Sequence, residues 1–241
     1  MGYWNYAPWE GHQSTEYPRN ARSVTFGGIN SFRDLHLILQ KTEETPPEPK
    51  LNLIDIAGAD GSRDLSEQPG GRIVYADREF VWTFGLYPHD SWREKQREVS
   101  NALNGKYCEI HIPADNGEKD DFHYVGRLIV NKYKRDGVLR QITIKAICRP
   151  YALRNVAFCR VYDLSADSQK IVISNDRMPV IPELITTADE TTVVFNGATF
   201  VMSAGTYQYT DIEFVEGNNT LEAKVTSGTG TLTVKFRGGT L

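Results

Sequence analysis

The sequence predicts a mainly β protein, with a larger N-terminal β domain that carries one α-helix and a smaller C-terminal β-sandwich of the jelly-roll kind. Apolar and polar residues alternate in short runs along most of the 241 residues, and turn-forming residues separate these runs. Only residues 91–105 carry the wider spacing of an amphipathic helix. The length is sufficient for two hydrophobic cores.

Composition divides the chain into an N-terminal extension (1–23), a first domain (24–151) and a second domain (152–241). Around Pro150 the strand pattern stops, and beyond it threonine, glycine and valine become frequent. The extension lacks the basic start and apolar core of a signal peptide, so we expect no export through the secretory pathway and no membrane partner. Its aromatic residues, expected to pack on a partner or on their own domain, are Tyr3, Trp4, Tyr6, Trp9 and Tyr17.

The first domain begins with two short runs and a charged segment. Residues 24–26 alternate into Gly27-Gly28, and a second period-two run spans residues 35–39, which predicts strand, turn, strand. Residues 41–49 are charged and rich in proline. We expect them to form an exposed loop or arm that cannot continue a strand ladder.

The stretch 50–84 combines two alternating runs with a loop rich in glycine and aspartate. Residues 51–56 form one expected strand and residues 79–84 the return strand. We predict that an ordered polar loop joins them, because its residues supply backbone freedom and side-chain caps for turns. The loop follows the pattern Gly-x-Asp-Gly-x-x-Asp at Gly58, Asp60, Gly61 and Asp64.

A helix is predicted from residue 91 to residue 103. Ser91 and Glu94 have the spacing of a capping box, and Asn104-Gly105 ends the helix because glycine readily takes the left-handed conformation. The expected apolar face contains Trp92, Val99, Ala102 and Leu103. The residues expected to face water are Arg93, Glu94, Lys95, Arg97 and Glu98.

Three more strands are predicted at residues 107–112, 124–130 and 138–148, with a hairpin turn at Asp136-Gly137. The basic residues before this turn, Lys132, Lys134 and Arg135, fit a solvated strand end. In the second domain only strand patterns occur, separated by Asn196-Gly197, Gly217-Asn218 and Gly228. Its alternating runs lie at residues 171–173, 193–195, 212–214, 221–225 and 232–236.

The sequence has few of the residue patterns that are typical of catalytic or metal-binding sites. The three cysteines, Cys108, Cys148 and Cys159, cannot all pair within one chain, and we predict reduced, small buried groups. Cys108, His111 and His123 do not fit a metal site, because Cys108 and His111 point to opposite faces of a strand. With no phosphate-binding loop or nucleophile elbow either, we predict no catalytic residue, no cofactor and no metal.

The net charge and two pairs of aspartates bear on other possible functions. The net charge of −4 gives no general attraction to nucleic acid. The pairs Asp120 with Asp121 and Asp60 with Asp64 could serve a glycosidase, although adjacent acids commonly just form turns. A polysaccharide hydrolase therefore stays open as an alternative.

Five motifs follow one another between Val24 and Tyr151. They are FGGINSFRDLHLIL (26–39), PEPKLNLIDIAGADGSRDLSE (47–67), YADREF (75–80), LNGK (103–106) and HYVGRLIV (123–130). In this order and spacing they resemble the distal tail protein family of long-tailed, non-contractile (siphovirus-type) bacteriophages.

The resemblance implies a first domain like the family's belt domain, a β-sandwich with one helix that closes into a hexameric ring, single or stacked. It implies a second domain like the family's galectin-like sandwich outside the ring. Such a ring is the hub between the tail tube and the tail tip or baseplate. The expected partners are therefore the major tail tube protein, a tail-tip protein and receptor-binding proteins, with DNA only passing through the channel. The expected location is the virion tail tip, after assembly in the host cytoplasm.

The resemblance also implies a role for the loop that is rich in glycine and aspartate. Gly58, Asp60, Gly61 and Asp64 are expected to fix the backbone geometry of a segment used in assembly. A carbohydrate-binding module for host surface recognition stays open as a second class of function. Its candidate sugar contacts are two aromatic residues of the C-terminal sandwich, Tyr207 and Tyr209.

Overall fold

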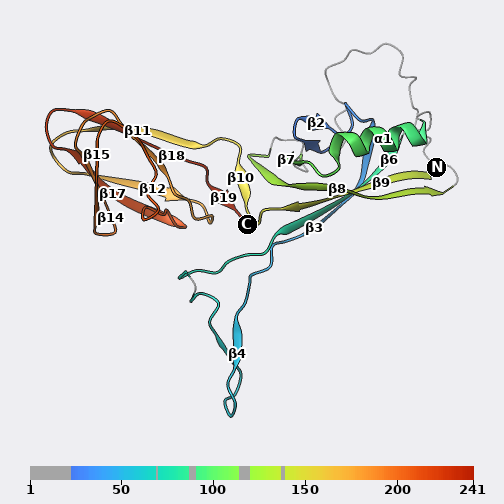
Figure 1. Cartoon of the computed structure of the whole chain (residues 1–241), viewed down its shortest axis with the longest axis horizontal. Helices are drawn as coiled ribbons and strands as arrows, with labels where there is room; N and C mark the ends of the chain where they lie inside the picture. The colour runs from blue at the N-terminus through green and yellow to red at the C-terminus, as the bar shows by residue number, and fades with distance from the viewer. Residues whose placement is uncertain (1–22, 69, 87–90, 114–119, 137–138) are drawn as a thin grey trace, which may run out of the picture.

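The structure is a computed structural model of the chain that describes residues 23–68, 70–86, 91–113, 120–136 and 139–241. The aromatic residues of the N-terminal extension lie outside the described residues. Two β units are placed end to end, and a narrow arm projects from the region between them (Figure 1). The described chain is mainly β, with antiparallel sheets and one α-helix, which confirms the predicted fold class.

The first unit is built on one antiparallel sheet with the strand order β2-β1-β7-β8-β9-β6-β3. Strand β10 pairs with β8 and with β19, the final strand of the chain. The strands are β1 (Thr25–Phe26), β2 (Ile29–Asn30), β3 (Leu37–Thr45), β6 (Arg78–Leu86), β7 (Tyr107–His111), β8 (Phe122–Asp136), β9 (Leu139–Cys148), β10 (Ala152–Arg154) and β19 (Gly239–Thr240).

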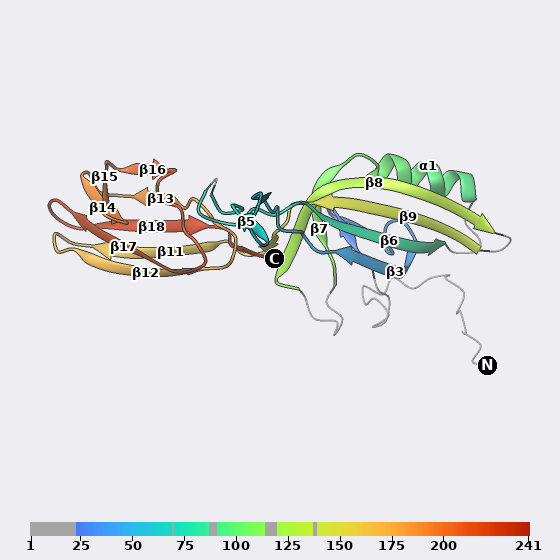
Figure 2. The same ribbon diagram turned by 90° about the horizontal axis from the view of Figure 1, so that it is seen from below.

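Alternate side chains of β6 form the centre of the first hydrophobic core. Phe80, Trp82 and Phe84 are buried on one face, as the period-two pattern predicts. The Phe80 and Trp82 rings stack with centroids 5.3 Å apart, and Phe26 meets Trp82 edge to face at 5.2 Å. Helix α1 (Trp92–Leu103) lies over β8 and adds Val99 to this core (Figure 2).

The ends of α1 agree with the prediction only in part. Ser91 takes the N-cap position, but its side chain makes no capping hydrogen bond, so the predicted capping box is wrong. Gly105, with φ of +77°, ends the helix as expected. Lys95 is buried rather than solvated, because it precedes Val99 by one turn on the apolar face. Its ammonium group pairs with Glu98 at 2.7 Å.

Strand β3 continues further than the charged sequence predicted. Residues 41–45 pair with β6 after a bulge between Leu39 and Lys41, so a loop beginning at residue 41 is wrong. Because β3 is the last strand in its sheet, its charged side chains stay exposed at the edge while its backbone pairs on the other side. The strand ends at Thr45, immediately before the two prolines.

The second unit is a β-sandwich of two four-stranded sheets, β11-β18-β13-β16 and β12-β17-β14-β15, around one apolar core. Asn196 and Gly197, with φ of +48° and +82°, form the predicted turn between β14 and β15. The strands are β11 (Phe158–Leu164), β12 (Gln169–Asn175), β13 (Glu183–Thr186), β14 (Thr191–Phe195), β15 (Ala198–Met202), β16 (Gly205–Tyr207), β17 (Gly217–Val225) and β18 (Gly230–Phe236).

Two details of the second unit differ from the prediction. In the run 212–214, Ile212 and Phe214 are buried, but the run forms only an isolated bridge between Phe214 and Val180, not a strand. Gly217-Asn218 lies inside β17 rather than at a separating turn, because both residues pair with the end of β12. The jelly-roll or galectin-like class of the sandwich and the boundaries at residues 23/24 and 151/152 stay predictions.

Candidate assembly surfaces

The arm is the segment 46–77 between β3 and β6 (Figure 1). At its outer end, β4 (Leu53–Asp55) pairs with β5 (Ser62–Asp64) in a two-stranded sheet. At its base, the amide of Lys50 donates to the Val74 carbonyl and the amide of Ala76 donates to the Glu48 carbonyl, both at 2.8 Å. The arm is therefore a double-stranded extension held at two levels.

This pairing corrects the predicted one. The return strand β6 lies in the main sheet between β3 and β9, and the predicted polar loop itself supplies β5, the partner of β4. Gly58 and Gly61 have φ of +83° and +76°, and a β-carbon at either would meet no atom within 4 Å. Both glycines therefore serve the backbone conformation of the turn, as expected, and not a close approach.

Asp64 closes the inner end of the β4–β5 hairpin through Ser66. Its carboxylate accepts the Ser66 amide at 2.9 Å and the Ser66 hydroxyl at 2.5 Å, and the hydroxyl oxygen in turn accepts the Asn52 amide at 2.8 Å. The hydroxyl hydrogen bond, followed by the amide, holds the pKa of Asp64 below its usual range. Asp64 thus ties the two strands together where β4 begins and β5 ends.

Large aliphatic side chains on the arm face solvent. Leu53 is 54% exposed and Ile54 is 46% exposed, although they point to opposite faces of the hairpin. A two-stranded hairpin is marginally stable in water by itself, and contiguous exposed apolar surface marks an interaction site. The other exposed aliphatic residues of the arm are Leu51, Ile56 and Val74.

The base of the arm contacts the second unit. Arg177 donates from Nη2 to the Tyr75 hydroxyl at 2.8 Å, and Arg72 forms a 3.2 Å ion pair with Glu213. Within the first unit, the Tyr75 ring meets Tyr151 edge to face at 6.1 Å. Exposed pairs of this kind contribute little to stability, so we expect them to orient the base of the arm without holding it rigidly. No local pattern in the sequence indicates the two arginine contacts, because their partners lie more than one hundred residues away.

A basic tip lies at the end of the hairpin formed by β8 and β9. Asp136 pairs with Leu139, which confirms the predicted hairpin, while the turn residues 137–138 lie outside the described residues. We define the basic tip as Lys132, Lys134, Arg135, Leu139 and Arg140. All are exposed except Arg140, which is half-buried.

The two candidate sugar contacts are stacked on one another. The Tyr207 and Tyr209 rings are 5.9 Å apart and parallel within 1°, and Phe200 packs against Tyr209 at 4.8 Å. Both tyrosines are half-buried, and burial, followed by the neighbouring Tyr207, raises the pKa of Tyr209. Sugar rings bind best to a free aromatic face, and here the two rings face each other. Their role in sugar binding stays a prediction.

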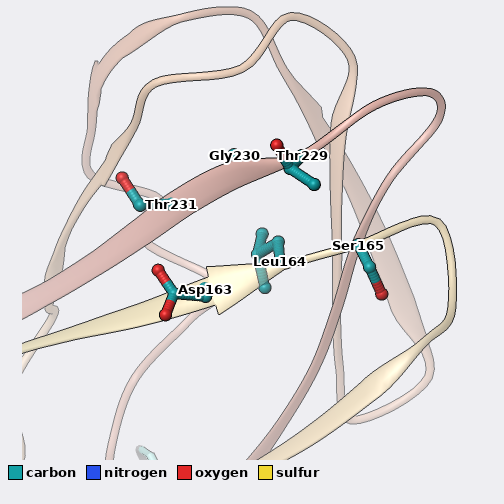
Figure 3. Close-up of a pocket in the computed structure, with 6 residues that line it drawn as sticks. All are labelled: Asp163, Leu164, Ser165, Thr229, Gly230 and Thr231. Atoms are coloured by element: carbon teal, nitrogen blue, oxygen red, sulfur yellow. The ribbon is translucent and has the colours of Figure 1, made fainter.

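An open groove of about 460 Å³ lies elsewhere on the second unit, between the end of β11 and the start of β18 (Figure 3). Neither Tyr207 nor Tyr209 contributes to its lining. Hydroxyl groups and one carboxylate line the groove, and its residues are Asp163, Leu164, Ser165, Thr229, Gly230 and Thr231.

The carboxylates proposed for a hydrolase have local structural contacts. Asp120 accepts the Phe122 amide at 3.1 Å, as a turn-forming aspartate does, and Asp64 is engaged by Ser66. The His111 and His123 rings lie 5.3 Å apart on neighbouring strands. Among the described residues, no group of three or more His, Cys, Asp or Glu side chains could hold a metal ion.

The cysteines of the chain are free, as predicted. Cys148 is buried and Cys108 half-buried, but Cys159 is exposed, so the prediction of buried thiols is wrong for Cys159. It lies on β11, an edge strand of the second unit, where alternate residues point to solvent. No helix in the described part of the chain is long and apolar enough to cross a membrane.

Comparisons with known proteins give a likeness in structure only. No protein-family model and no curated protein matches the sequence. The fold is similar to that of the crystal structure of SPP1 Dit (gp 19.1), a protein described as a paradigm of the hub adsorption apparatus in phages that infect Gram-positive bacteria. The alignment covers 89% of this chain and 98% of that chain, with a TM-score of 0.62 and 12% sequence identity. At this identity the likeness shows that the two chains share a fold.

Proposed function

We propose that this chain is the distal tail protein of a phage tail, a structural subunit whose copies close into a ring. The proposal is supported by the fold shared with a phage hub protein over 89% of the chain. It is also supported by the five motifs between residues 24 and 151, which point to the same family independently of the structure. No enzymatic activity is part of this function.

The observation that carries the proposal is the arm. Its exposed aliphatic side chains have no core of their own. Full burial of one Leu or Ile side chain contributes about 1.5–3 kcal/mol, and about half of this remains to be gained where the residue is 46–58% exposed. A second copy of the chain can supply that cover. Because the arm differs from the surface that would receive it, the contact is head-to-tail, and a head-to-tail contact that closes forms a ring.

The finer features follow from the family resemblance. The ring consists of six copies, single or stacked, and joins the tail tube protein to a tail-tip protein. The first domain forms the ring, and the second domain lies outside it and carries proteins that adsorb to the host. The protein is then part of the virion tail tip and is assembled in the host cytoplasm.

Light scattering coupled to size exclusion, across micromolar concentrations, tests this function. The wild-type chain is expected to form a hexamer. The double variant Leu53→Asn with Ile54→Asn is expected to need at least about tenfold more protein to assemble, because it removes exposed apolar surface from both faces of the arm. Val172→Asn with Val201→Asn is the matched control, since these valines are 51% and 65% exposed on the second unit. A wild-type chain that stays monomeric throughout contradicts the proposal.

A further inference from the structure

We propose that the basic tip of one copy is the surface that receives the arm of the neighbouring copy. This inference rests on the proposed function, because it names the partner surface within the ring. It is drawn from the positions, charges and exposed apolar residues of the two segments.

The arm and the basic tip leave the first unit at opposite ends. Next to the arm, Thr45 at the end of β3 pairs with Glu79, and Glu79 pairs with Ile147 near the end of β9. At the other end of β9, Leu139 pairs with Asp136. Both views show the arm near the second unit and the ends of β8 and β9 at the far side (Figures 1 and 2). One subunit therefore presents two different surfaces at opposite ends of its first unit, as a head-to-tail contact requires.

The two surfaces carry opposite charge. Between residues 52 and 67 the arm has four acids and one arginine, 1 − 4, a net charge of −3. The described end of the β8–β9 hairpin, residues 132–136 and 139–140, has four cations and Asp136, 4 − 1, a net charge of +3. These charged side chains are exposed except for the half-buried Arg140. Complementary charge of this kind selects the partner surface and its register.

On both surfaces, exposed apolar residues lie beside the charged ones. Leu139 on the basic tip is 44% exposed, beside four cations. On the arm, Ile54 and Ile56 are 46% and 48% exposed, beside Asp55. An interface with an apolar centre and a charged rim follows when these surfaces meet. A nucleic acid would use the cations of the basic tip but would leave the aliphatic residues of the arm uncovered, so an acidic, apolar protein segment fits better.

Charge reversal on either side tests the inference. The tip variant is Lys134→Glu with Arg135→Glu, and the arm variant is Asp60→Lys with Glu67→Lys. Each alone places like charges in contact, so each is expected to need at least about tenfold more protein to form rings. The matched control is Lys170→Glu with Lys224→Glu, which changes the same charge on exposed positions of the second unit and is expected to form rings like the wild type.

Mixing the two variants gives the sharpest result. In an equal mixture, each reversed tip can meet a reversed arm and each native tip a native arm, so rings of alternating subunits are expected in native mass spectrometry. Recovery on mixing also shows that both variants are folded. Rings formed by the tip variant alone at the wild-type concentration overturn the inference and leave the proposed function standing. Loss of bound DNA from the tip variant without a change in ring formation overturns it as well. Absence of rings from the wild-type chain itself is the failure of the proposed function.

Discussion

The carboxylate of Asp64 accepts two hydrogen bonds from Ser66, one from its amide at 2.9 Å and one from its hydroxyl at 2.5 Å. The Ser66 hydroxyl oxygen also accepts the amide of Asn52 on the other strand of the arm. One side chain therefore holds both strands of the arm in register, at the point where a neighbouring copy is proposed to bind.

Replacing Asp64 with alanine is expected to weaken ring assembly more than it lowers the stability of the two β units. The substitution removes the oxygen that accepts both hydrogen bonds, so the arm loses its preformed shape while neither core is touched. Asp64→Asn is the control, since the amide oxygen can still accept from Ser66, and it is expected to assemble better than Asp64→Ala. Sedimentation velocity measures assembly, and thermal unfolding measures stability. Equal assembly by wild type and Asp64→Ala would show that ring assembly does not depend on the shape of the arm.

The junction between the units is expected to weaken in acid. Arg154 donates two hydrogen bonds to Asp176, at 2.5 and 2.8 Å, and these bonds hold the pKa of Asp176 below its usual value of 3.8. When a carboxyl group has a lower pKa in the folded state than in the unfolded state, it stabilises the fold at pH values above its unfolded pKa. This contribution is lost as the pH falls through the folded pKa. The loss is therefore expected below about pH 3.8.

The urea midpoint at pH 5 and at pH 2.5 measures this effect. Asp176→Asn is expected to lose less stability between the two pH values than wild type, because its side chain does not titrate. Asp163→Asn, at an exposed carboxylate of the second unit, is the control and is expected to follow wild type. An identical acid response in wild type and Asp176→Asn would contradict the role of the pair.

Two isoleucines on β9 provide a matched test of the first core. Ile144 is fully buried opposite Trp82, whereas Ile147 is 40% exposed on the other face of the same strand. Ile144→Ala is expected to lower the free energy of unfolding by about 2–5 kcal/mol, and Ile147→Ala by less than about 1 kcal/mol. Urea unfolding followed by tryptophan fluorescence measures both. Similar losses at the two positions would mean that the faces of β9 are wrongly assigned.

The thiols are expected to react in the order of their exposure. Burial raises the pKa of Cys148 to about 12 and also raises the pKa of Cys108, while Cys159 is exposed. Iodoacetamide at pH 8 should therefore modify Cys159 first, Cys108 slowly and Cys148 only after unfolding. Peptide mass spectrometry of timed samples identifies each site. Early modification of Cys148 in the folded protein would contradict its place in the core.

The sequence predicted what depends on local patterns. Alternation placed Phe80, Trp82 and Phe84 in the core because side chains on a strand alternate between its faces. It could not predict that residues 53–55 pair within the arm, since the same alternation fits any antiparallel partner. The contact between Tyr75 and Arg177 joins residues 102 positions apart and leaves no local pattern.

Charged residues inside regular elements were the other source of error. Lys95 was assigned to solvent by its charge, but its aliphatic stem packs beside Val99 while Glu98 pairs with its ammonium group. Residues 41–45 were assigned to a loop by their charge, although an edge strand accepts charged side chains. In both places the position in the fold, and not the residue type, decided the outcome.

Negative-stain electron microscopy of the purified protein tests whether copies of this chain form a closed ring. We expect rings with a central channel and six-fold symmetry, with the second units projecting outside. Images of single, elongated particles at every micromolar concentration, with no ring among them, would contradict it.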